Sequence, residues 1–417
     1  MSALRSAPAA TDADAAVRTQ VARARRSLVA LFAATFTELT GLFLFGPLLL
    51  FTLKARGLDT AAVGAFAALQ WVGLLVATPF ASSWVLRLGP RKALLASGAV
   101  PLATLAGMQV WHSLPGWSLL YFVAGMASAL RWILAEATVA ELAPPHRRGR
   151  VMGLFAMMIG VTFMVGPALL SLLLSAGWHT QGVGWVAVAL VALGLLLLVP
   201  VRPPPTAAAS ASGAHSGWRG TWGAVRAAPL VMLTGFVGGF FESGLASTLP
   251  LYGLTVGLSV ASSALLVSVS GLGSTLLAPL AGELADRLSS ARVRRACALV
   301  CLLATLGLLA VPHWGVLAWL VAFCWGGAGA ALYTLAMIDI GQRHQGVALV
   351  NSTAVLVMAY TAGGMLAPAL GGAMLQWAPG FGFPALLAVV ALLGWWPVAP
   401  GALGTISARQ GRVSRHD

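Results

Sequence analysis

The sequence predicts an all-α membrane protein with twelve transmembrane helices in two six-helix bundles and both termini in the cytoplasm. Composition gives the first indication: of 417 residues, 59% are hydrophobic and 9% charged, with a mean hydropathy of +0.88. Soluble domains are about 45–50% apolar and about 25% charged. A soluble core cannot bury so much apolar surface, so lipid must cover it. This composition excludes a soluble enzyme, a disordered chain and a secreted disulfide scaffold.

Long apolar runs are the second observation. A helix needs about 20 apolar residues to cross a hydrocarbon core about 30 Å thick, and continuous runs are unlike the alternating strands of a porin-type barrel. Three long runs, 62–86, 262–288 and 347–377, are expected to tilt or to extend past the bilayer. In order, the twelve predicted spans are 28–51, 62–86, 93–111, 117–142, 151–176, 182–201, 229–252, 262–288, 296–311, 316–340, 347–377 and 381–397.

The distribution of basic residues is the third observation. Of the 25 Lys and Arg residues, 22 fall on one side of the predicted topology, in the amino-terminal arm, the even-to-odd loops and the tail. The opposite loops hold only Lys54 and Arg56, and Arg131 lies inside a predicted helix. Because cytoplasmic loops are enriched in Lys and Arg, both termini are predicted to be cytoplasmic. The net charge of +14 is thus a signal of membrane topology, and no nucleic-acid partner is expected.

These observations divide the chain into five parts. A segment rich in Pro, Ala, Ser and Gly separates the two predicted bundles and is typical of a flexible linker. The predicted parts are a cytoplasmic arm at 1–27, a six-helix bundle at 28–201, the cytoplasmic linker at 202–226, a second six-helix bundle at 227–399 and a cytoplasmic tail at 400–417.

The two bundles also match each other in sequence. A shift of 200 residues places Gly57-Leu58 on Gly257-Leu258, Pro79 on Pro279 and Arg87-Leu88 on Arg287-Leu288. Two parallel six-helix repeats joined by a cytoplasmic linker are the layout of major facilitator transporters.

Short motifs strengthen the resemblance to the major facilitator superfamily. Gly282, Asp286 and Arg287 stand as in its G-x-x-x-D-R/K signature, and Arg148-Gly149-Arg150 resembles its R-G-R turn. The first copy of the signature keeps Arg87, Arg91 and Lys92 but has Ser82 and Leu86 in place of its Gly and Asp. The resemblance therefore implies a gating role for these loops that rests on Asp286 alone.

One branch of the superfamily is more similar still. The segments 132–136, 249–252, 329–333 and 350–368 resemble the YcaD-type branch of bacterial major facilitator proteins. This resemblance implies the fold and says little about the substrate. In the fold that it implies, helices 1, 4, 7 and 10 line a central cavity.

Glu38 and Arg131 are charged residues predicted to lie inside the membrane. A charge at mid-bilayer costs at least about 2.5–3.5 kcal/mol, so each needs a partner or water. Glu38 lies about 15 Å and Arg131 about 16 Å from the same membrane edge, so we expect them to approach each other. The pair is a candidate for proton coupling, and the alternative is a static pair that holds helices 1 and 4 together.

Glu136 and Glu242 are the other intramembrane carboxyls. Glu136 is about 9 Å from the cytoplasmic end of its helix, and we expect a gating role in which it anchors the Arg147–Arg150 turn or the Arg87–Lys92 loop; substrate contact is the alternative. Glu242 lies near mid-membrane with no basic residue evident at its depth. It is predicted to be a proton site or to contact a cationic substrate, and the alternative is a neutral carboxyl bonded to helix backbone.

Polar and aromatic residues on the predicted helices supply candidates for the wall of a substrate cavity. Each has an alternative as a packing or interface residue. The candidates are Gln70, Trp325, Tyr333, Asn351 and Tyr360.

Missing motifs narrow the function. No lysine stands in a P-loop, so ATP hydrolysis by that route is excluded, and no H-E-x-x-H or G-x-S-x-G motif is present. The three cysteines are interpreted as buried apolar residues, and no metal, cofactor or enzymatic activity is expected.

The sequence thus predicts a monomeric secondary active transporter of the inner membrane, whose partners are lipid, a small organic solute and protons. We expect it to be proton-coupled and to export amphipathic or cationic compounds. The alternatives are a proton-coupled importer of an organic anion that uses Arg131, and a non-transporting sensor or assembly protein on the same scaffold.

Overall fold

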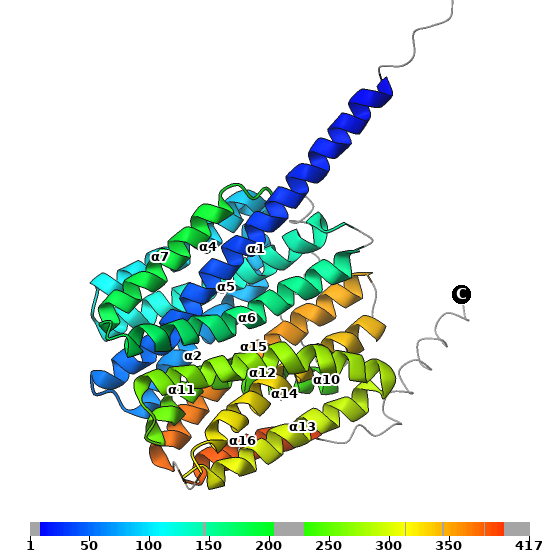
Figure 1. The fold of residues 1–417 in the computed structure, drawn as a ribbon. Helices are drawn as coiled ribbons and strands as arrows, with labels where there is room; N and C mark the ends of the chain where they lie inside the picture. The colour runs from blue at the N-terminus through cyan, green and yellow to red at the C-terminus, as the bar shows by residue number, and fades with distance from the viewer. Residues whose placement is uncertain are drawn as a thin grey trace, which may run out of the picture.

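The computed structural model describes residues 9–144, 147–203, 229–312, 314–343, 346–378 and 380–395. Its helices form two groups that pack side by side, α1 to α7 and α10 to α16 (Figure 1). Within the described residues, eleven helices are long and apolar enough to cross a membrane, and the shorter apolar helix Gly382–Trp395 follows them. This agrees with the twelve predicted spans and with the predicted all-α membrane fold.

The amino-terminal half begins and ends its helices within a few residues of the prediction, with two exceptions. The predicted span 62–86 is interrupted by a 3₁₀ turn, Thr78–Phe80, which contains Pro79. The first helix begins at Ala9 instead of Leu28. The elements are α1 (Ala9–Ala55), α2 (Thr60–Ala77), η1 (Thr78–Phe80), α3 (Ala81–Leu88), α4 (Pro90–Val110), α5 (Leu114–Leu142), α6 (Arg148–Ser175) and α7 (Thr180–Leu198).

The carboxy-terminal half follows the prediction equally closely, and again one span is interrupted. The predicted span 229–252 contains a π-helical turn, η3, over Phe240–Gly244. The elements are α10 (Pro229–Gly239), η3, α11 (Leu245–Thr255), α12 (Val260–Arg287), α13 (Ser290–Gly307), η4 (Leu308–Ala310), α14 (Leu317–Arg343), α15 (Gly346–Trp377) and α16 (Gly382–Trp395).

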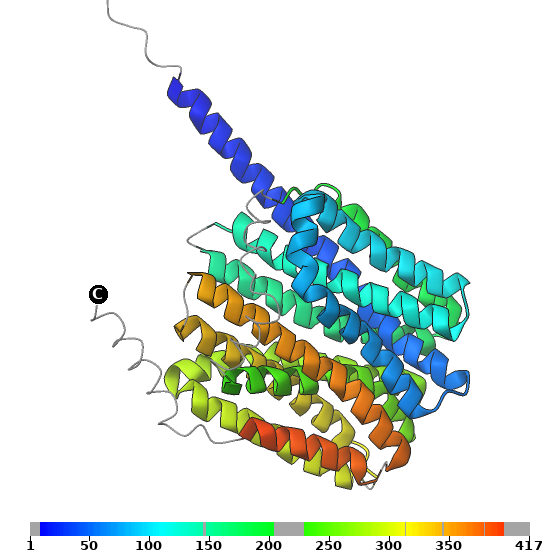
Figure 2. The same ribbon diagram turned by 180° about the vertical axis from the view of Figure 1, so that it is seen from behind.

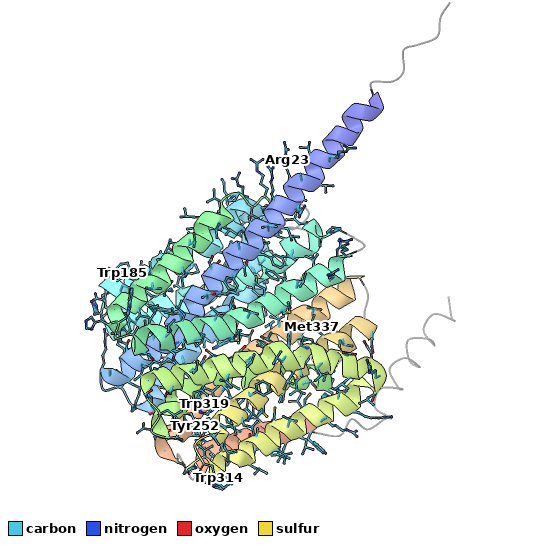
Figure 3. The ribbon with its side chains drawn as sticks, in the orientation of Figure 1. Arg23, Trp185, Tyr252, Trp314, Trp319 and Met337 are labelled. Atoms are coloured by element: carbon cyan, nitrogen blue, oxygen red, sulfur yellow. The ribbon has the colours of Figure 1, made fainter. Side chains whose placement is uncertain are left out.

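The predicted arm at 1–27 is helical from Ala9 onward and continuous with the first span. Figure 3 shows this part of α1 extending beyond the bundle, with Arg23 on it. The helix continues because residues 9–27 contain neither proline nor glycine, the two residues least compatible with a helix interior. The predicted linker from residue 204 to 226 and the tail at 400–417 lie outside the described residues.

The sequence repeat is visible in the backbone. Gly57 and Gly257 both have positive φ, at 87° and 82°, and each ends a helix in the same way: Leu58 donates to the Leu53 carbonyl, and Leu258 donates to the Gly253 carbonyl. These are Schellman-type ends, in which glycine adopts the left-handed conformation. The helix that follows each glycine begins at Thr60 in one half and at Val260 in the other, so the shift of 200 residues relates equivalent structure.

The two halves meet where α6 packs against α12 (Figure 1) and where α2 packs against α15 (Figure 2). Small residues allow these crossings. A Cβ on Gly64 would lie 2.2 Å from the Pro368 carbonyl oxygen and 2.8 Å from the Gly372 Cα, and a Cβ on Gly160 would lie 2.9 Å from the Thr275 hydroxyl. In the repeat, α12 is the counterpart of α2, and α15 is the counterpart of α6. Exchanging the two halves therefore turns the α2–α15 contact into the α12–α6 contact, which is the relation that a two-fold axis between the repeats requires.

One end of the bundle carries the basic loops. The start of α1 and the end of α16 lie toward this end (Figure 2), as do the α3–α4 connection with Arg87 and Arg91 and the α12–α13 connection with Arg287. Trp185 and Trp314 are exposed near the opposite end (Figure 3), where aromatic side chains are typical of a membrane–water interface. We call the first end the basic end; its cytoplasmic orientation stays a prediction from the charge rule.

The Gly64 crossing yields a first prediction. Gly64→Ala should lower the stability of the purified protein by about 1–3 kcal/mol, the usual cost of overpacking, because the new methyl group would meet backbone atoms that cannot rotate away. Thermal unfolding at a fixed scan rate measures the change.

Gly153→Ala is the matched control for this substitution. Gly153 also lies inside a helix, but a Cβ there meets no atom within 4 Å, so this variant should unfold at or above the wild-type temperature. An unchanged unfolding temperature in Gly64→Ala would show that the crossing is looser than its geometry indicates.

Candidate functional site

Glu38 and Arg131 form a buried ion pair between α1 and α5. The Arg131 Nε donates to the Glu38 carboxylate over 2.8 Å, and the Arg131 guanidinium also donates to the Thr35 hydroxyl over 3.1 Å. Glu38 is 1% exposed and Arg131 is 5% exposed. The two residues therefore make the contact that their equal depth in the membrane led us to expect.

The surroundings of this pair are those of a packed core. A Cβ on Gly194 of α7 would lie 2.9 Å from the Glu38 Cβ, so α7 closes over this face of α1. One Glu38 oxygen, Oε1, and one Arg131 nitrogen, Nη1, are buried without a hydrogen-bond partner. The pair holds α1 to α5 inside the amino-terminal half, and its proton-coupling role stays a proposal.

Breaking this pair from one side gives a second prediction. Arg131→Met should destabilise the protein by about 3–5 kcal/mol, because it leaves the Glu38 carboxylate buried without its cation. The double variant Glu38→Gln with Arg131→Met should recover most of that loss, since neither charge remains. Thermal unfolding of the wild type, both single variants and the double variant completes a double-mutant cycle, and additive losses would contradict mutual dependence of the two charges.

Glu242 lies in the π-helical turn η3 between α10 and α11. Such turns are rare and occur frequently at functional sites. Glycines permit close packing around it: a Cβ on Gly329 of α14 would lie 2.7 Å from the Glu242 backbone nitrogen, and a Cβ on Gly239 would lie 2.0 Å from the Tyr360 carbonyl oxygen. Two neighbouring helices therefore approach the η3 backbone at the point where it carries a carboxyl.

Tyr360 of α15 is the hydrogen-bond partner of Glu242. Its hydroxyl donates to the Glu242 Oε2 over 3.0 Å, and the same hydroxyl is hydrogen-bonded to the hydroxyl of Ser243. Glu242 is partly exposed, whereas Tyr360 and Ser243 are buried. The carboxyl is therefore held by a neutral donor, and among the described residues no Lys or Arg forms an ion pair with it.

Trp132 of α5 connects this group to the amino-terminal half. Its ring meets the Tyr360 ring edge-on, with centroids 6.2 Å apart, and its indole Nε1 donates to the Glu136 Oε1 over 2.7 Å. Tyr333 of α14 packs on Tyr360 with ring centroids 4.8 Å apart and is close enough to Glu136 and Glu242 to interact electrostatically with both. We call Trp132, Glu136, Glu242, Tyr333 and Tyr360 the seam cluster, because it joins the two halves.

Glu136 makes its hydrogen bond within α5, and our expectation that it anchors the basic loops stays a prediction. Its carboxyl accepts the Trp132 indole N–H, one helical turn away on the same face of α5. It therefore faces the aromatic residues of the seam cluster. This position favours the alternative that we gave for Glu136, a contact with the substrate.

Two of the remaining cavity candidates, Trp325 and Gln70, lie outside this cluster. Trp325 is fully buried, donates to the Thr305 hydroxyl over 3.2 Å and packs near Phe241; it belongs to the core of the carboxy-terminal half, which corrects our expectation that it lines the cavity. Gln70 is half-buried on α2, where its carbonyl oxygen meets Gly125 of α5. Asn351 lies on α15, and its side chain is outside the described residues.

The gating motifs lie at the basic end. Arg287 pairs with Glu283 one turn earlier on α12, and both are largely exposed, so the pair contributes little stability. Gly282 and Asp286 lie on the same helix, and Gly149 lies in the first turn of α6. Four further candidates are exposed at helix ends: Arg87, Arg91, Lys92 and Arg148. Their gating role stays a proposal.

Sequence reasoning missed several parts of the site. Trp132 stands four residues before Glu136, the spacing at which side chains on one helix face meet, so this bond was open to prediction. The π-helical turn leaves no recognisable pattern in the sequence, and the partnership of Ser243 and Tyr360 depends on it. Within the described ranges, no group of three His, Cys, Asp or Glu residues is placed to hold a metal ion.

Comparison with known proteins agrees with this architecture. Residues 31–353 match the family model described as Major Facilitator Superfamily. The chain is 26% identical over 339 residues to an uncharacterized MFS-type transporter, YcaD, of Salmonella paratyphi A, covering 79% of this chain and 84% of that protein. YcaD of Salmonella typhimurium is also 26% identical, over 78% of this chain and 82% of that protein.

Solved structures share the fold at low identity. A D-xylose–proton symporter has a TM-score of 0.72 at 15% identity, covering 89% of this chain and 97% of that one. The human organic anion transporter MFSD10 has a TM-score of 0.64 at 16% identity, covering 89% and 98%. The chain thus belongs to the major facilitator superfamily: it is a multi-pass membrane protein and a secondary transporter of a small molecule, not an enzyme.

Proposed function

We propose that the chain is a proton-coupled exporter of amphipathic or cationic organic compounds in the bacterial inner membrane. The seam cluster carries this proposal, because it sets two carboxyls and three aromatic rings at the junction of the halves without an ion-paired basic side chain among the described residues. The bacterial relatives support the inner membrane as the location. We propose a monomer as the working unit.

The chemistry of the seam cluster favours a cation. Aromatic faces attract an organic cation by about 0.5–2 kcal/mol each, depending on desolvation, and a carboxylate adds a direct charge interaction. Glu136 and Glu242 are both partly exposed, as are Trp132 and Tyr333. An organic anion would meet two carboxyls here, and Arg131, the cation that an anion importer would need, is already bonded to Glu38 and Thr35.

Proton coupling follows from the same carboxyls. A carboxyl held by neutral donors can exist charged or neutral without losing a fixed ion pair, so a proton and a cationic substrate compete for it. In a secondary transporter, rocking of the two halves then exposes the carboxyl to each side in turn. The fold is shared with a protein named as a D-xylose–proton symporter, which supports a proton as the coupling ion. Glu242 is our first coupling residue, with the Glu38–Arg131 pair as a second.

Flux measurements on Glu242 test this proposal. In proteoliposomes with an imposed pH gradient, the wild type should move tetraphenylphosphonium or ethidium, and Glu242→Gln should reduce gradient-driven flux at least tenfold because it removes the titrating group. Asp59→Asn is the control, since that carboxyl is exposed at the end opposite to the basic end and an Asn oxygen can still cap α2, and it should keep wild-type flux. If Glu242→Gln kept full gradient-driven flux, Glu242 would not be a coupling residue. If Glu38→Gln lost gradient-driven flux and Glu242→Gln did not, the coupling role would belong to the Glu38–Arg131 pair.

Affinity measurements on Glu136 test the cation assignment. Glu136→Gln should weaken tetraphenylphosphonium binding about tenfold, the equivalent of about 1.4 kcal/mol, by removing one negative charge beside the rings. Trp132→Phe keeps a ring and removes the indole donor, so it should retain most of the affinity. Equilibrium dialysis with the labelled cation measures both variants, and wild-type affinity in Glu136→Gln would remove this residue from the substrate site.

A further inference from the structure

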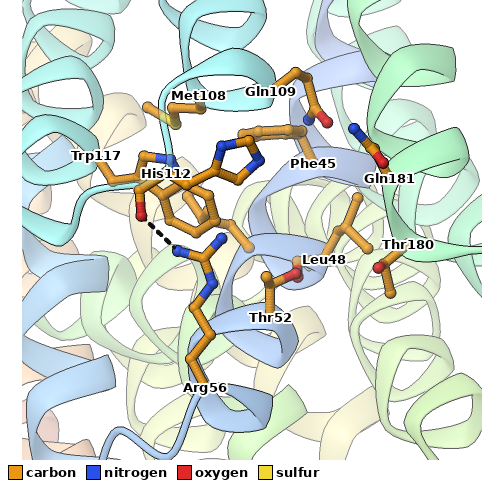
Figure 4. Close-up of a pocket in the computed structure, with 11 residues that line it drawn as sticks. Phe45, Leu48, Thr52, Arg56, Met108, Gln109, His112, Trp117, Thr180 and Gln181 are labelled. Carbon is orange, nitrogen blue, oxygen red and sulfur yellow. Dashed lines mark hydrogen bonds between the residues drawn. The ribbon is translucent and has the colours of Figure 1, made fainter.

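A concave site lies inside the amino-terminal half, at the end opposite to the basic end. A pocket of about 150 Å³ opens between α1, α4, α5 and α7. Figure 4 shows Arg56 and His112 on one side of it and Thr180 and Gln181 on the other. It is separate from the seam cluster, because its lining comes from the amino-terminal half alone.

The pocket has an apolar floor and a polar rim. Phe45, Leu48 and Trp117 are among the buried side chains of the floor. The exposed rim is polar and includes Arg56 and Gln181. A largely apolar surface with a few convergent polar groups is the general form of small-molecule sites. Such sites commonly measure about 300–1,000 Å³, so a pocket of this size admits only a small occupant.

Arg56 is the charged group of this rim. Its guanidinium lies over the Trp117 ring, with Cζ 4.0 Å from the ring centroid, and Nη1 donates to the His112 carbonyl over 3.0 Å. Of the carboxylates in the described residues, none forms an ion pair with it. The nearest acid in sequence, Asp59, accepts the Ala62 N–H and caps α2. The ring and the carbonyl thus hold the guanidinium in place while its positive charge stays uncompensated.

Two further features favour an anion at this position. α7 begins at Thr180 without a side-chain cap, so the partial positive charge of its first turn adds to that of Arg56. Arg56 also lies on the side of the membrane where the topology holds only one other basic residue, Lys54. Lys and Arg on this side oppose the rule that basic residues stay in cytoplasmic loops. The charge of Arg56 therefore does not help to orient the chain, and we infer that it serves a local purpose.

We propose that this pocket binds a small organic carboxylate, with its carboxylate on the Arg56 guanidinium and its apolar body against Trp117, Phe45 and Leu48. A guanidinium suits a carboxylate because its N–H groups form a planar fork. Such a ligand joins the end of α1 to the α4–α5 connection and to the first turn of α7, and therefore stabilises the amino-terminal half without entering the seam cluster.

Benzoate binding to the purified full-length chain tests this inference. Benzoate should raise the unfolding temperature and change the tryptophan fluorescence, and benzamide, which has the same ring without the charge, should bind at least tenfold more weakly. Arg56→Gln should weaken benzoate binding at least tenfold, because it removes the positive charge and the planar N–H fork that bind the carboxylate. Equal binding of benzoate and benzamide would overturn the proposal.

Matched variants separate this site from general charge effects. Lys54 lies two residues from Arg56 and donates to the Thr60 hydroxyl outside the pocket, so Lys54→Gln should bind benzoate as the wild type does. Gln181→Trp fills the rim from its exposed side and should abolish binding with Arg56 intact. Equal losses in Lys54→Gln and Arg56→Gln would overturn the proposal, as would loss of benzoate binding in Glu242→Gln, which would place the ligand at the seam.

A longer acid distinguishes the two sources of such a carboxylate. Laurate represents a membrane-derived acyl chain, and the small volume of the pocket predicts that it binds at least tenfold more weakly than benzoate. Tighter, Arg56-dependent binding of laurate would overturn the assignment to a small soluble acid.

Discussion

The organisation of this protein depends on one constraint: an ionisable group inside hydrocarbon must have a partner or reach water. The carboxyls of Glu38, Glu136 and Glu242 meet it in different ways. Glu38 has a cation, Arg131, at 2.8 Å. In the described part of the chain, by contrast, Glu136 accepts from the Trp132 indole and Glu242 accepts from the Tyr360 hydroxyl, and both donors are neutral. The first arrangement fixes a charge in place, and the other two leave the charge state of the carboxyl open. We therefore propose that the partner of each carboxyl separates a structural role for Glu38 from a functional role for Glu136 and Glu242.

The same constraint links the carboxyls to the motion of the halves. Glu136 belongs to the amino-terminal half and Glu242 to the carboxy-terminal half, and the ring contact of Trp132 with Tyr360 lies between them. Rocking of one half against the other must change this contact, and with it the access of water to both carboxyls. A ligand that binds them differently in the two states shifts the equilibrium between those states. A substrate at the seam cluster is therefore placed to influence the conformation.

Much of the fold was predictable because lipid imposes simple rules. Apolar length identified the spans, and the positions of Gly57 and Gly257 identified a repeat that the backbone bears out. Equal depth predicted the contact between Glu38 and Arg131 only together with the family resemblance, which implies that helices 1 and 4 line one cavity. Depth could not show which helix face Glu136 occupies relative to the other half, and apolar character could not distinguish Trp325 in a core from Tyr360 at the seam. The positions of Glu136, Trp325 and Tyr360 depend on how helices that are distant in the sequence pack together. The residues around each position in the sequence do not determine that packing.

The π-helical turn indicates which contacts survive the motion. On one side of it, a Cβ on Gly239 would lie 2.0 Å from the Tyr360 carbonyl oxygen; on the other, a Cβ on Gly244 would lie 2.3 Å from the Ala367 Cβ. α15 is therefore packed against both ends of η3, and sliding between them would force backbone atoms together. The Tyr360–Glu242 bond should consequently move as one body with the carboxy-terminal half. The ring contact of Trp132 with Tyr360 joins residues of different halves, so we propose that the movement that opens the seam separates these two rings and leaves the Glu242 carboxyl with its hydroxyl partner.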